Sequence, residues 1–364
     1  MKTKHNFKEE KMPLSNRIRE ISKKALETHT VAGVITLRKT SPDSAAHTLV
    51  TDSKAIDETD ALAPYFPGNV ADFVKKLTRI APPKEKILVI LRPCEMRAAI
   101  ELTKLAQIQN ENIIWLAFDC PGTIPRKDIK GKEIPTGDDF YAKAIESDDG
   151  IRSVCASCDY VRADTADIGF LAFEKDAPFI AYTDTGKEFM KSIGENFVNE
   201  APTEGLNAII SRKSDGKKKL YEKLESEVKG LDNIAKTFAG CVNCHNCMTN
   251  CPICFCRECF FESEAMDFEG DIFIDLAQRK GGLRAPTDIG LFHLGRMSHM
   301  TTSCVSCGAC EEACPEDIPV GQIFKWVAEN VQKTFDYVAG RGWDETPPLK
   351  TFSEKELEEV AGNE

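Results

Sequence analysis

The sequence predicts an α/β domain followed by a mainly helical domain that is built around cysteine-rich loops. In the first 200 of the 364 residues, apolar runs such as KILVIL and NIIWLAF alternate with helical patterns. Strand, helix and strand within about 30 residues indicates parallel strands joined by a crossover helix. After residue 240, two cysteine runs of identical spacing dominate the chain. A chain of this length is expected to form two or three domains.

The first predicted domain covers residues 1–200 and alternates strands with helices. Lys86–Leu91 and Asn112–Phe118 are its clearest strands, and Glu95–Gln107 between them is an amphipathic helix. The remaining predicted elements are strands at Val31–Leu37, Ala166–Phe173 and Pro178–Tyr182, and a helix that starts at Gly186–Ile193. These elements predict an open sheet with parallel strands.

The second half begins with residues 201–240, a charged helical connector, and continues with the cysteine-rich domain at 241–340. In that domain Thr287–Met300 has apolar residues at helical spacing, and Pro286 suits its start. Its two histidines, His293 and His299, are expected to pack or to lie at the surface rather than to bind metal. Ile318–Val338 is a further amphipathic helix that stops at Gly340, and residues 341–364 form an acidic tail.

Two runs of the form C-x2-C-x2-C-x3-C-P carry the strongest chemical signal. This spacing is that of two-cluster bacterial ferredoxins, in which the fourth cysteine of each run ligates the other cluster. The predicted ligands are therefore Cys241, Cys244, Cys247 and Cys314 for one 4Fe–4S cluster and Cys304, Cys307, Cys310 and Cys251 for the other. Zinc is the alternative, but zinc sites usually use C-x2-C pairs or mix cysteine with histidine. Disulfides do not suit an odd count of 15 cysteines without a secretory signal.

A second group of four cysteines lies in the first domain. Cys94 and Cys120 each follow a predicted strand, so parallel strands would bring both to the sheet edge where ligands bind in open α/β folds. Cys155 and Cys158 form a C-x2-C pair that would complete a third metal site. The alternative is that these are buried, inert thiols.

Three cysteines remain, in the segment CPICFCREC. Cys254, Cys256 and Cys259 are ligands of a further cluster, or one of them replaces Cys251, or they are plain thiols.

Composition excludes several classes of function. The net charge of −11 argues against nucleic acid as a partner. The first 27 residues have no apolar core, and no run approaches 18 apolar residues, so neither a secretory signal nor a transmembrane segment is expected. Free thiolates and clusters survive best in a reducing compartment, which predicts a cytoplasmic protein.

Four segments resemble the beta-subunit family of coenzyme F420-reducing hydrogenases and F420-linked formate dehydrogenases. They are LVILRPCEMRAAIELTKL, WLAFDCPGT, CASCDYVRADTADIGF and AYTDTGKEF, and they occur in the same order over roughly residues 85 to 195. The resemblance implies FAD and a 4Fe–4S cluster in the first domain, with Cys94, Cys120, Cys155 and Cys158 as cluster ligands. This chain departs from the hydrogenase subunit in carrying its ferredoxin module at the C-terminal side.

Two further resemblances concern the cysteine-rich domain. PTDIGLFHLGRMSHMTTSCVSCGACEEACP is similar to ferredoxin-like subunits of heterodisulfide reductases, and CPICFC is similar to dicluster subunits of sulfhydrogenases and anaerobic sulfite reductases. With the flavin included, the predicted fold class is an α/β (α+β) FAD and iron–sulfur domain followed by a mainly helical two-cluster ferredoxin-like domain.

The flavin is implied by the resemblance alone, because neither G-x-G-x-x-G nor G-x-x-x-x-G-K-[ST] occurs. Candidate flavin-phosphate contacts are basic residues at strand ends, Arg92 and either Arg38 or Lys39, and a turn at Thr183, Thr185 and Gly186. A flavin accepts hydride from a carrier such as F420 or NAD(P)H and passes single electrons to clusters.

The sequence therefore predicts an oxidoreductase subunit that is active within a complex. It would link a hydride carrier at FAD, through three or more 4Fe–4S clusters, to a hydrogenase, formate dehydrogenase or heterodisulfide-reductase-like partner subunit. The alternatives are a flavin-free electron-transfer module of such a complex and a zinc-binding scaffold without redox activity.

Overall fold

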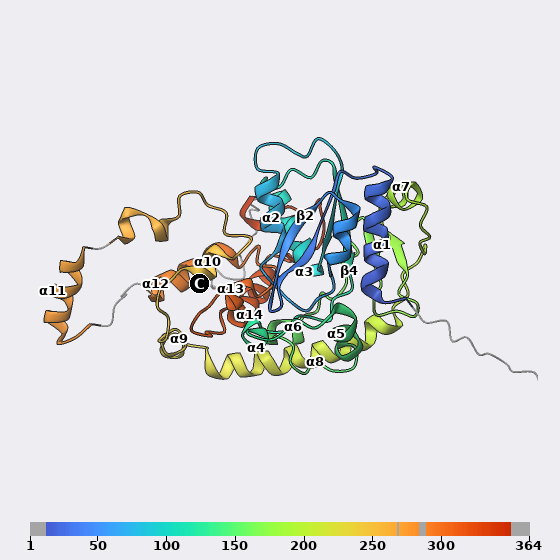
Figure 1. The fold of residues 1–364 in the computed structure, drawn as a ribbon. Coiled ribbons are helices and arrows are strands. Elements are labelled where there is room, and N and C mark those ends of the chain that lie inside the picture. The colour runs from blue at the N-terminus through green and yellow to red at the C-terminus, as the bar shows by residue number, and fades with distance from the viewer. Residues whose placement is uncertain (1–11, 268, 284–288, 351–364) are drawn as a thin grey trace, which may run out of the picture.

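The computed structural model describes residues 12–267, 269–283 and 289–350, and its first half is built on a six-stranded sheet (Figure 1). The strand order is β2-β1-β3-β4-β5-β6. The strands are β1 Gly33–Ser41, β2 Ser44–Val50, β3 Ile87–Leu91, β4 Ile113–Phe118, β5 Ile168–Phe170 and β6 Phe179–Ala181. The four inner strands run parallel, whereas β2 and β6 are antiparallel edge strands. The mixed α/β prediction is confirmed, and the β1–β2 hairpin is an addition to it.

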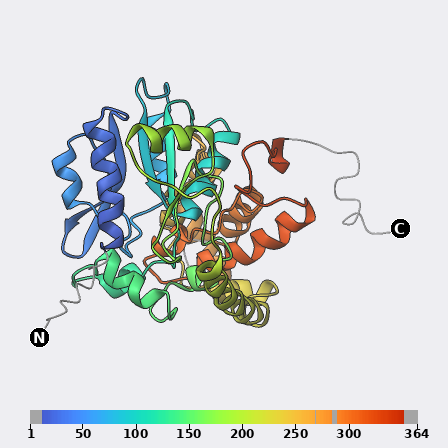
Figure 2. The same ribbon diagram turned by 90° about the vertical axis from the view of Figure 1, so that its right-hand side faces the viewer.

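Helices cover both faces of the sheet, as expected for parallel strands that read as continuous apolar runs. On one face, α1 Leu14–Glu27, α5 Gly137–Ala144 and α7 Asp184–Ser192 pack on β3 and β4 through residues such as Leu88 and Leu116. On the other face, α2 Val70–Leu77 and α3 Pro93–Lys104 pack on Val89 and Trp115. Figure 2 shows α1 (blue) on one side of the sheet and the C-terminal helices on the other.

Shorter elements lie in the loops of this first unit. They are the 3-10 helix η1 Ser53–Glu58 and the one-turn helices α4 Arg126–Ile129 and α6 Ser153–Ala156.

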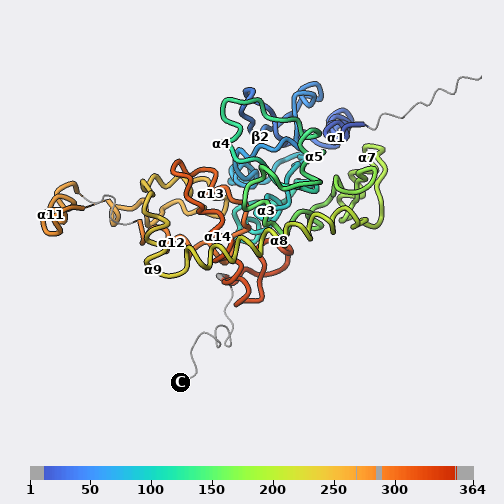
Figure 3. Tube along the Cα trace, turned by 90° about the horizontal axis from the view of Figure 1, so that it is seen from below, coloured from blue at the N-terminus to red at the C-terminus, as the bar shows by residue number. Residues whose placement is uncertain are grey.

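The predicted connector is a long helix that packs along the molecule. Helix α8 Glu204–Glu227 is followed by α9 Leu231–Thr237, and in the view from below α8 runs under both halves of the chain (Figure 3). A Cβ at Gly216 would lie 2.5 Å from the carbonyl oxygen of Ala156, so glycine lets α8 approach α6 closely. Lys217 forms ion pairs with Asp159 and Glu329, which joins α8 to both halves.

The C-terminal module consists of short helices around the cysteine loops. These are α10 Asn246–Thr249, η2 Phe260–Glu262, η3 Glu264–Met266, α11 Gly270–Lys280, α12 Ile289–Met300, α13 Ala309–Glu312 and α14 Val320–Thr334. The apolar core of this module is continuous with the α3 side of the sheet, because Phe292 and Phe324 belong to the same cluster as Val89. Helix α11 buries no side chain and projects from the body (Figure 1). The predicted start of α12 at Pro286 and Thr287 lies outside the described residues.

The first ten residues of the predicted tail fold back on the first unit. Trp343 Nε1 donates a 3.0 Å hydrogen bond to the carbonyl oxygen of Thr165, and its ring lies 6.5 Å from that of Trp115. The 3-10 helix η4 Pro348–Lys350 follows, and residues 351–364 lie outside the described part. Among the described helices, none combines the length and the apolar character needed to cross a membrane.

Candidate metal centres

Two hollows in the C-terminal module are each lined by four cysteines. The outer hollow, of about 320 Å³, is lined by Cys241, Cys244, Cys247 and Cys314. The inner hollow, of about 420 Å³, is lined by Cys251, Cys304, Cys307 and Cys310. Each set combines three cysteines of one run with the fourth cysteine of the other run. Both sets are those that the ferredoxin rule predicts, and ligation by them stays a prediction.

The loops that carry these thiols have matching backbones. Asn243 and His245 in the first run have φ of 53° and 57°, and Ser306 and Gly308 in the second run have φ of 59° and 69°. These left-handed residues curl each loop, so that consecutive thiols turn toward one hollow. The backbone N–H of Asn243 donates to Cys241 Sγ at 3.4 Å, an amide–sulfur contact that would also suit a metal-bound thiolate.

Burial controls the protonation of these thiols. It raises the pKa of Cys247 and Cys304 to about 11 and that of Cys307 to about 12. Cys251 is the exception, because a hydrogen bond from the Cys254 thiol lowers its pKa. The other three are therefore neutral thiols without metal, and binding a cluster would release their protons.

Helix α12 supplies two buried nitrogen-bearing side chains to the hollows. Arg296, which is 2% exposed, donates from Nη1 to Cys247 Sγ at 3.1 Å and from Nη2 to the Cys247 carbonyl at 3.0 Å. His293 Nε2 lies 3.4 Å from Cys241 Sγ, and its ring stacks on Phe238 with centroids 3.9 Å apart. Burial lowers the pKa of His293 to about 4, with the Arg296 charge adding to the effect.

The role of Arg296 was not predicted, although the sequence holds a signal for it. Arg296 stands four residues after Phe292 and four before Met300, so a helix places it on the apolar face. For His293, the predicted packing role agrees with its burial, and its contact with Cys241 is additional.

The first-domain cysteines meet at the carboxyl end of the sheet. β3 and β4 are parallel neighbours, which brings Cys94 in the first turn of α3 and Cys120 after β4 to the same edge. Burial raises the pKa of Cys94 well above its usual range, and the charges of Glu95, Cys307, Cys120 and Cys155 raise it further. Burial likewise raises the pKa of Cys120 to about 12; Arg92 opposes this, whereas Cys155 and Cys158 add to it. Cys94 and Cys120 therefore lie within electrostatic reach of Cys155, and Cys120 also lies within reach of Cys158.

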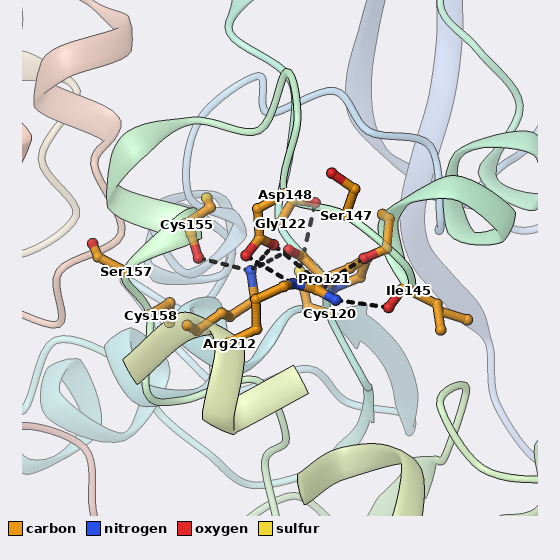
Figure 4. A network of polar contacts seen from close by, with 12 residues as sticks. Cys120, Pro121, Gly122, Ile145, Ser147, Asp148, Cys155, Ser157, Cys158 and Arg212 are labelled. Carbon is orange, nitrogen blue, oxygen red and sulfur yellow. Dashed lines mark hydrogen bonds and ion pairs between the residues drawn. The ribbon is translucent and has the colours of Figure 1, made fainter. Parts of the chain in front are cut away.

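A buried lysine joins the two loops that carry Cys120 and Cys155. Lys213 on α8 donates to the carbonyls of Pro121 at 2.7 Å and Cys155 at 2.9 Å, and its Nζ lies 3.1 Å from Asp148 Oδ1. Arg212 also binds Asp148, at 2.9 and 3.2 Å (Figure 4). A Cβ at Gly122 would lie 2.9 Å from Cys155 Cβ, so only glycine permits this approach of the loops. The sequence pattern of α8 did not distinguish Lys213 from its exposed neighbours.

Arg152 connects the first-domain thiols to the inner hollow. Its guanidinium donates to Thr123 Oγ1 at 3.2 Å and to the Cys307 carbonyl at 3.0 Å, and its Nε lies 3.1 Å from Glu312 Oε1. A Cβ at Gly308 would lie 2.3 Å from Arg152 Nη2, so this loop needs glycine where the first run has His245. The first-domain thiols, the inner hollow and the outer hollow therefore follow one another in space.

The spacing of the thiols bears on the kind of metal that fits. All fifteen cysteines are free thiols. Within the described ranges, no three His, Cys, Asp or Glu side chains are gathered closely enough to hold one metal ion. A zinc ion would draw four ligands to about 2.0–2.3 Å from one point. Each thiolate around a cubane binds a different iron, so the ligands of a cubane stand farther apart than those of a zinc ion.

The three remaining cysteines do not converge. Cys254 Sγ lies 3.2 Å from Met300 Sδ, Cys259 Sγ lies 3.6 Å from Met248 Sδ, and Cys256 is exposed. None of them lines either hollow. Cys254 is the one beside a predicted ligand, Cys251.

The residues predicted to contact a flavin phosphate have other roles in the fold. Arg92 is 3% exposed, and its Nη2 donates to the carbonyls of Ala63 and Tyr65, both at 2.9 Å. Lys39 donates to the Ile134 carbonyl at 3.0 Å, and Arg38 pairs with Glu58. The guanidinium of Arg92 therefore has its partners inside the protein.

The predicted turn at Thr183, Thr185 and Gly186 lies at the opposite edge of the sheet from Cys94, because β6 runs antiparallel to β5. Thr183 caps α7 through Gly186 N–H at 3.1 Å, and a Cβ at Gly186 would lie 2.1 Å from the Asp167 carbonyl oxygen. Thr185 is exposed. The direction of β6 therefore places this turn away from the first-domain thiols, and a flavin contact by Thr183, Thr185 or Gly186 stays a prediction.

Comparisons with known proteins find similarities to both halves of the chain. The sequence model described as a 4Fe-4S dicluster domain matches residues 237–318, which include both cysteine runs up to Cys314. The F420-dependent formate dehydrogenase subunit beta of Methanocaldococcus jannaschii is 28% identical over 83% of this chain and 85% of its own length. The F420-dependent formate dehydrogenase 1 subunit beta of Methanococcus maripaludis is 29% identical over 93% of this chain and 94% of its own.

The chain is similar to these beta subunits over most of its length. The predicted resemblance is therefore confirmed, and the match extends from residues 85–195 to most of the chain. Among solved structures, a chain of the F420-reducing [NiFe] hydrogenase complex from Methanosarcina barkeri is similar, with a TM-score of 0.41 and 14% identity over 59% of this chain and 86% of that one. At this level the structural likeness adds nothing to the assignment.

Proposed function

We propose that this beta-subunit relative is an electron-transferring iron–sulfur subunit that links coenzyme F420 to a formate dehydrogenase partner. F420 is proposed as the carrier and formate dehydrogenase as the partner because both words occur in the names of the two relatives. The observation that carries the proposal is the line of three thiol sets, in which Arg152 joins the first-domain loops to the Cys307 loop of the inner hollow.

Each thiol set is proposed to hold one 4Fe–4S cluster. Cys94, Cys120, Cys155 and Cys158 would hold the first, and the cysteines of the inner and outer hollows would hold the other two. Clusters exchange single electrons, so adjoining sites form a route through the protein. The route would end at the outer hollow, where Cys244 is exposed and can come close to a partner subunit.

FAD at the first-domain end would convert hydride transfer into single-electron transfer. The predicted contacts do not fit it, because Arg92 is satisfied internally and the Thr183 turn lies at the other sheet edge. FAD in this proposal therefore rests on the resemblance to the beta-subunit family, and no step is derived through it. The same observation favours the second candidate function, a flavin-free iron–sulfur module of the same kind of complex.

Metal and flavin analysis of anaerobically purified protein tests the proposal. We expect about twelve irons and as much acid-labile sulfide per chain, four for each set of four cysteines. Zinc in place of iron would refute the redox function. Eight irons in the wild-type protein, with the same eight in a Cys158→Ser variant, would refute the first-domain cluster. Fluorescence of FAD released on denaturation separates the flavoprotein from the flavin-free module.

Kinetics with reduced F420 and with NAD(P)H test the carrier. Cys307→Ala should leave the first-domain site reducible by the carrier but lose electron transfer to the partner. Cys158→Ser should interrupt transfer one step earlier and leave the clusters of the two hollows intact. Transfer to the partner at the unmodified rate in the Cys307 variant would contradict the route.

A further inference from the structure

Arg296 lies between the two hollows and contacts the linings of both. Its Nη1 donates to Cys247 Sγ of the outer hollow at 3.1 Å, while the same side chain forms part of the lining of the inner hollow. The charges of Cys247, Cys251 and Cys310 raise the pKa of Arg296 against desolvation by burial, so thiols of both sets lie near the guanidinium. No other side chain contributes both a lining group to one hollow and a hydrogen bond to a thiol of the other among the contacts found in the described residues.

The charge of Arg296 is not balanced by a carboxylate. Arg296 is 2% exposed, and no ion pair with Asp or Glu is found for it in the described part of the chain. Its Nε is buried without a hydrogen-bond partner. A buried cation without a counter-charge is costly, so an anion close to it is expected. A cubane held by four thiolates carries net negative charge, and that charge increases by one on reduction.

Aromatic rings fix the position of this guanidinium. Its carbon lies 4.8 Å from the centroid of Phe324 on α14 and 5.5 Å from that of Phe292 on α12. The two Nη groups bind Cys247 as a fork, one to its sulfur and one to its carbonyl at 3.0 Å. A lysine could supply the charge but not both bonds in this geometry.

We infer that Arg296 is a positioning residue that raises the reduction potentials of both cluster sites and couples them through one shared charge. This inference rests on the proposed function. Because the added electron makes each cluster more negative, a fixed cation stabilises the reduced form more than the oxidised form. The outer site should feel Arg296 more strongly, since its Cys247 thiolate also receives a hydrogen bond.

Redox titration of the full chain, followed by EPR, tests the inference with three variants. Arg296→Gln should shift both potentials to more negative values, with the larger shift at the outer site. Arg296→Lys keeps the charge and breaks the fork, so it should lower the outer potential and leave the inner one nearly unchanged. Arg279→Gln is the control, since Arg279 is exposed on α11 and pairs only with Asp275 among the ion pairs found.

Each outcome decides the matter. Unchanged potentials in Arg296→Gln at full iron content, or equal shifts in Arg296→Gln and Arg279→Gln, would overturn the inference but not the proposed function. If Arg296→Gln fails to retain iron, Arg296→Lys decides, and two unchanged potentials in it would overturn the inference. Wild-type protein that binds no cluster in these hollows would overturn the proposed function and the inference together.

Discussion

Replacement of Lys213 by methionine should selectively weaken the first-domain metal site. The ammonium of Lys213 is fully buried and holds the carbonyls of Pro121 and Cys155, which belong to the two loops that carry Cys120 and Cys155. Methionine retains the apolar stem but leaves both carbonyls without their donor. Asp148 keeps its bonds to Arg212, so no charge is stranded.

The expected magnitude follows from these contacts. Hydrogen bonds to charged groups contribute roughly 1.5–3 kcal/mol each, and removal of one partner of a buried pair costs about 3–5 kcal/mol. Because Asp148 stays paired, we expect the low end, about 3 kcal/mol. That corresponds to roughly 100-fold more frequent opening of the two loops.

Two measurements on anaerobic protein check this expectation. Iron should fall from about twelve to about eight per chain, since one four-iron site is lost. Amide hydrogen exchange near residues 120–123 and 152–158 should accelerate by about two orders of magnitude, in line with the cost of opening. The matched control is Lys219→Met, which changes an exposed lysine on the same helix. If Lys213→Met retains all its iron and its amides exchange like those of Lys219→Met, the Lys213 contacts do not stabilise the first-domain metal site.

Three further predictions concern Glu329 on α14, Gly308 in a loop of the inner hollow, and His293 beside the outer hollow. Burial alone would raise the pKa of Glu329, but hydrogen bonds from Lys217 and Tyr221 lower it to about 2. The stability that ionised Glu329 gives the fold is therefore complete above its ordinary pKa of 4.5 and is lost as pH falls toward 2. Glu329→Gln should therefore lower the free energy of unfolding by about 1–2 kcal/mol at pH 7, allowing for solvent screening, and urea titrations should show this difference vanish in acid. Gly308→Ala should lower the free energy of unfolding by about 2 kcal/mol or more and release iron from the inner site, because Gly308 has a positive φ and an added Cβ would meet Arg152. Gly281 also has a positive φ, but an added Cβ there would meet no atom within 4 Å, so Gly281→Ala is the control. A Gly308→Ala protein as stable as Gly281→Ala would refute that reasoning. His293→Phe keeps the stack on Phe238 but removes the ring nitrogen that lies 3.4 Å from Cys241 Sγ. If this nitrogen donates to a cluster-bound thiolate, the outer potential alone should fall in an EPR-monitored titration; an equal fall at the inner site would contradict the assignment.

The sequence was sufficient for features that depend on local spacing. The two cysteine runs predict which thiols share a hollow, because the exchange of the fourth cysteine is a property of the motif itself. The parallel arrangement of β3 and β4 also followed from a short strand–helix–strand pattern, and it brings Cys94 and Cys120 to one edge. In both cases a few neighbouring residues carry the information.

Only the tertiary structure decided how charge and direction are arranged around these sites. Lys213 and Arg152 resemble surface residues in a sequence, since their partners are carbonyls from distant segments. The strand direction of β6 separates the Thr183 turn from the thiols, and no pattern within that short strand specifies its direction. A main-chain carbonyl exists at every residue, so which one meets a buried cation depends on packing and not on the identity of either residue.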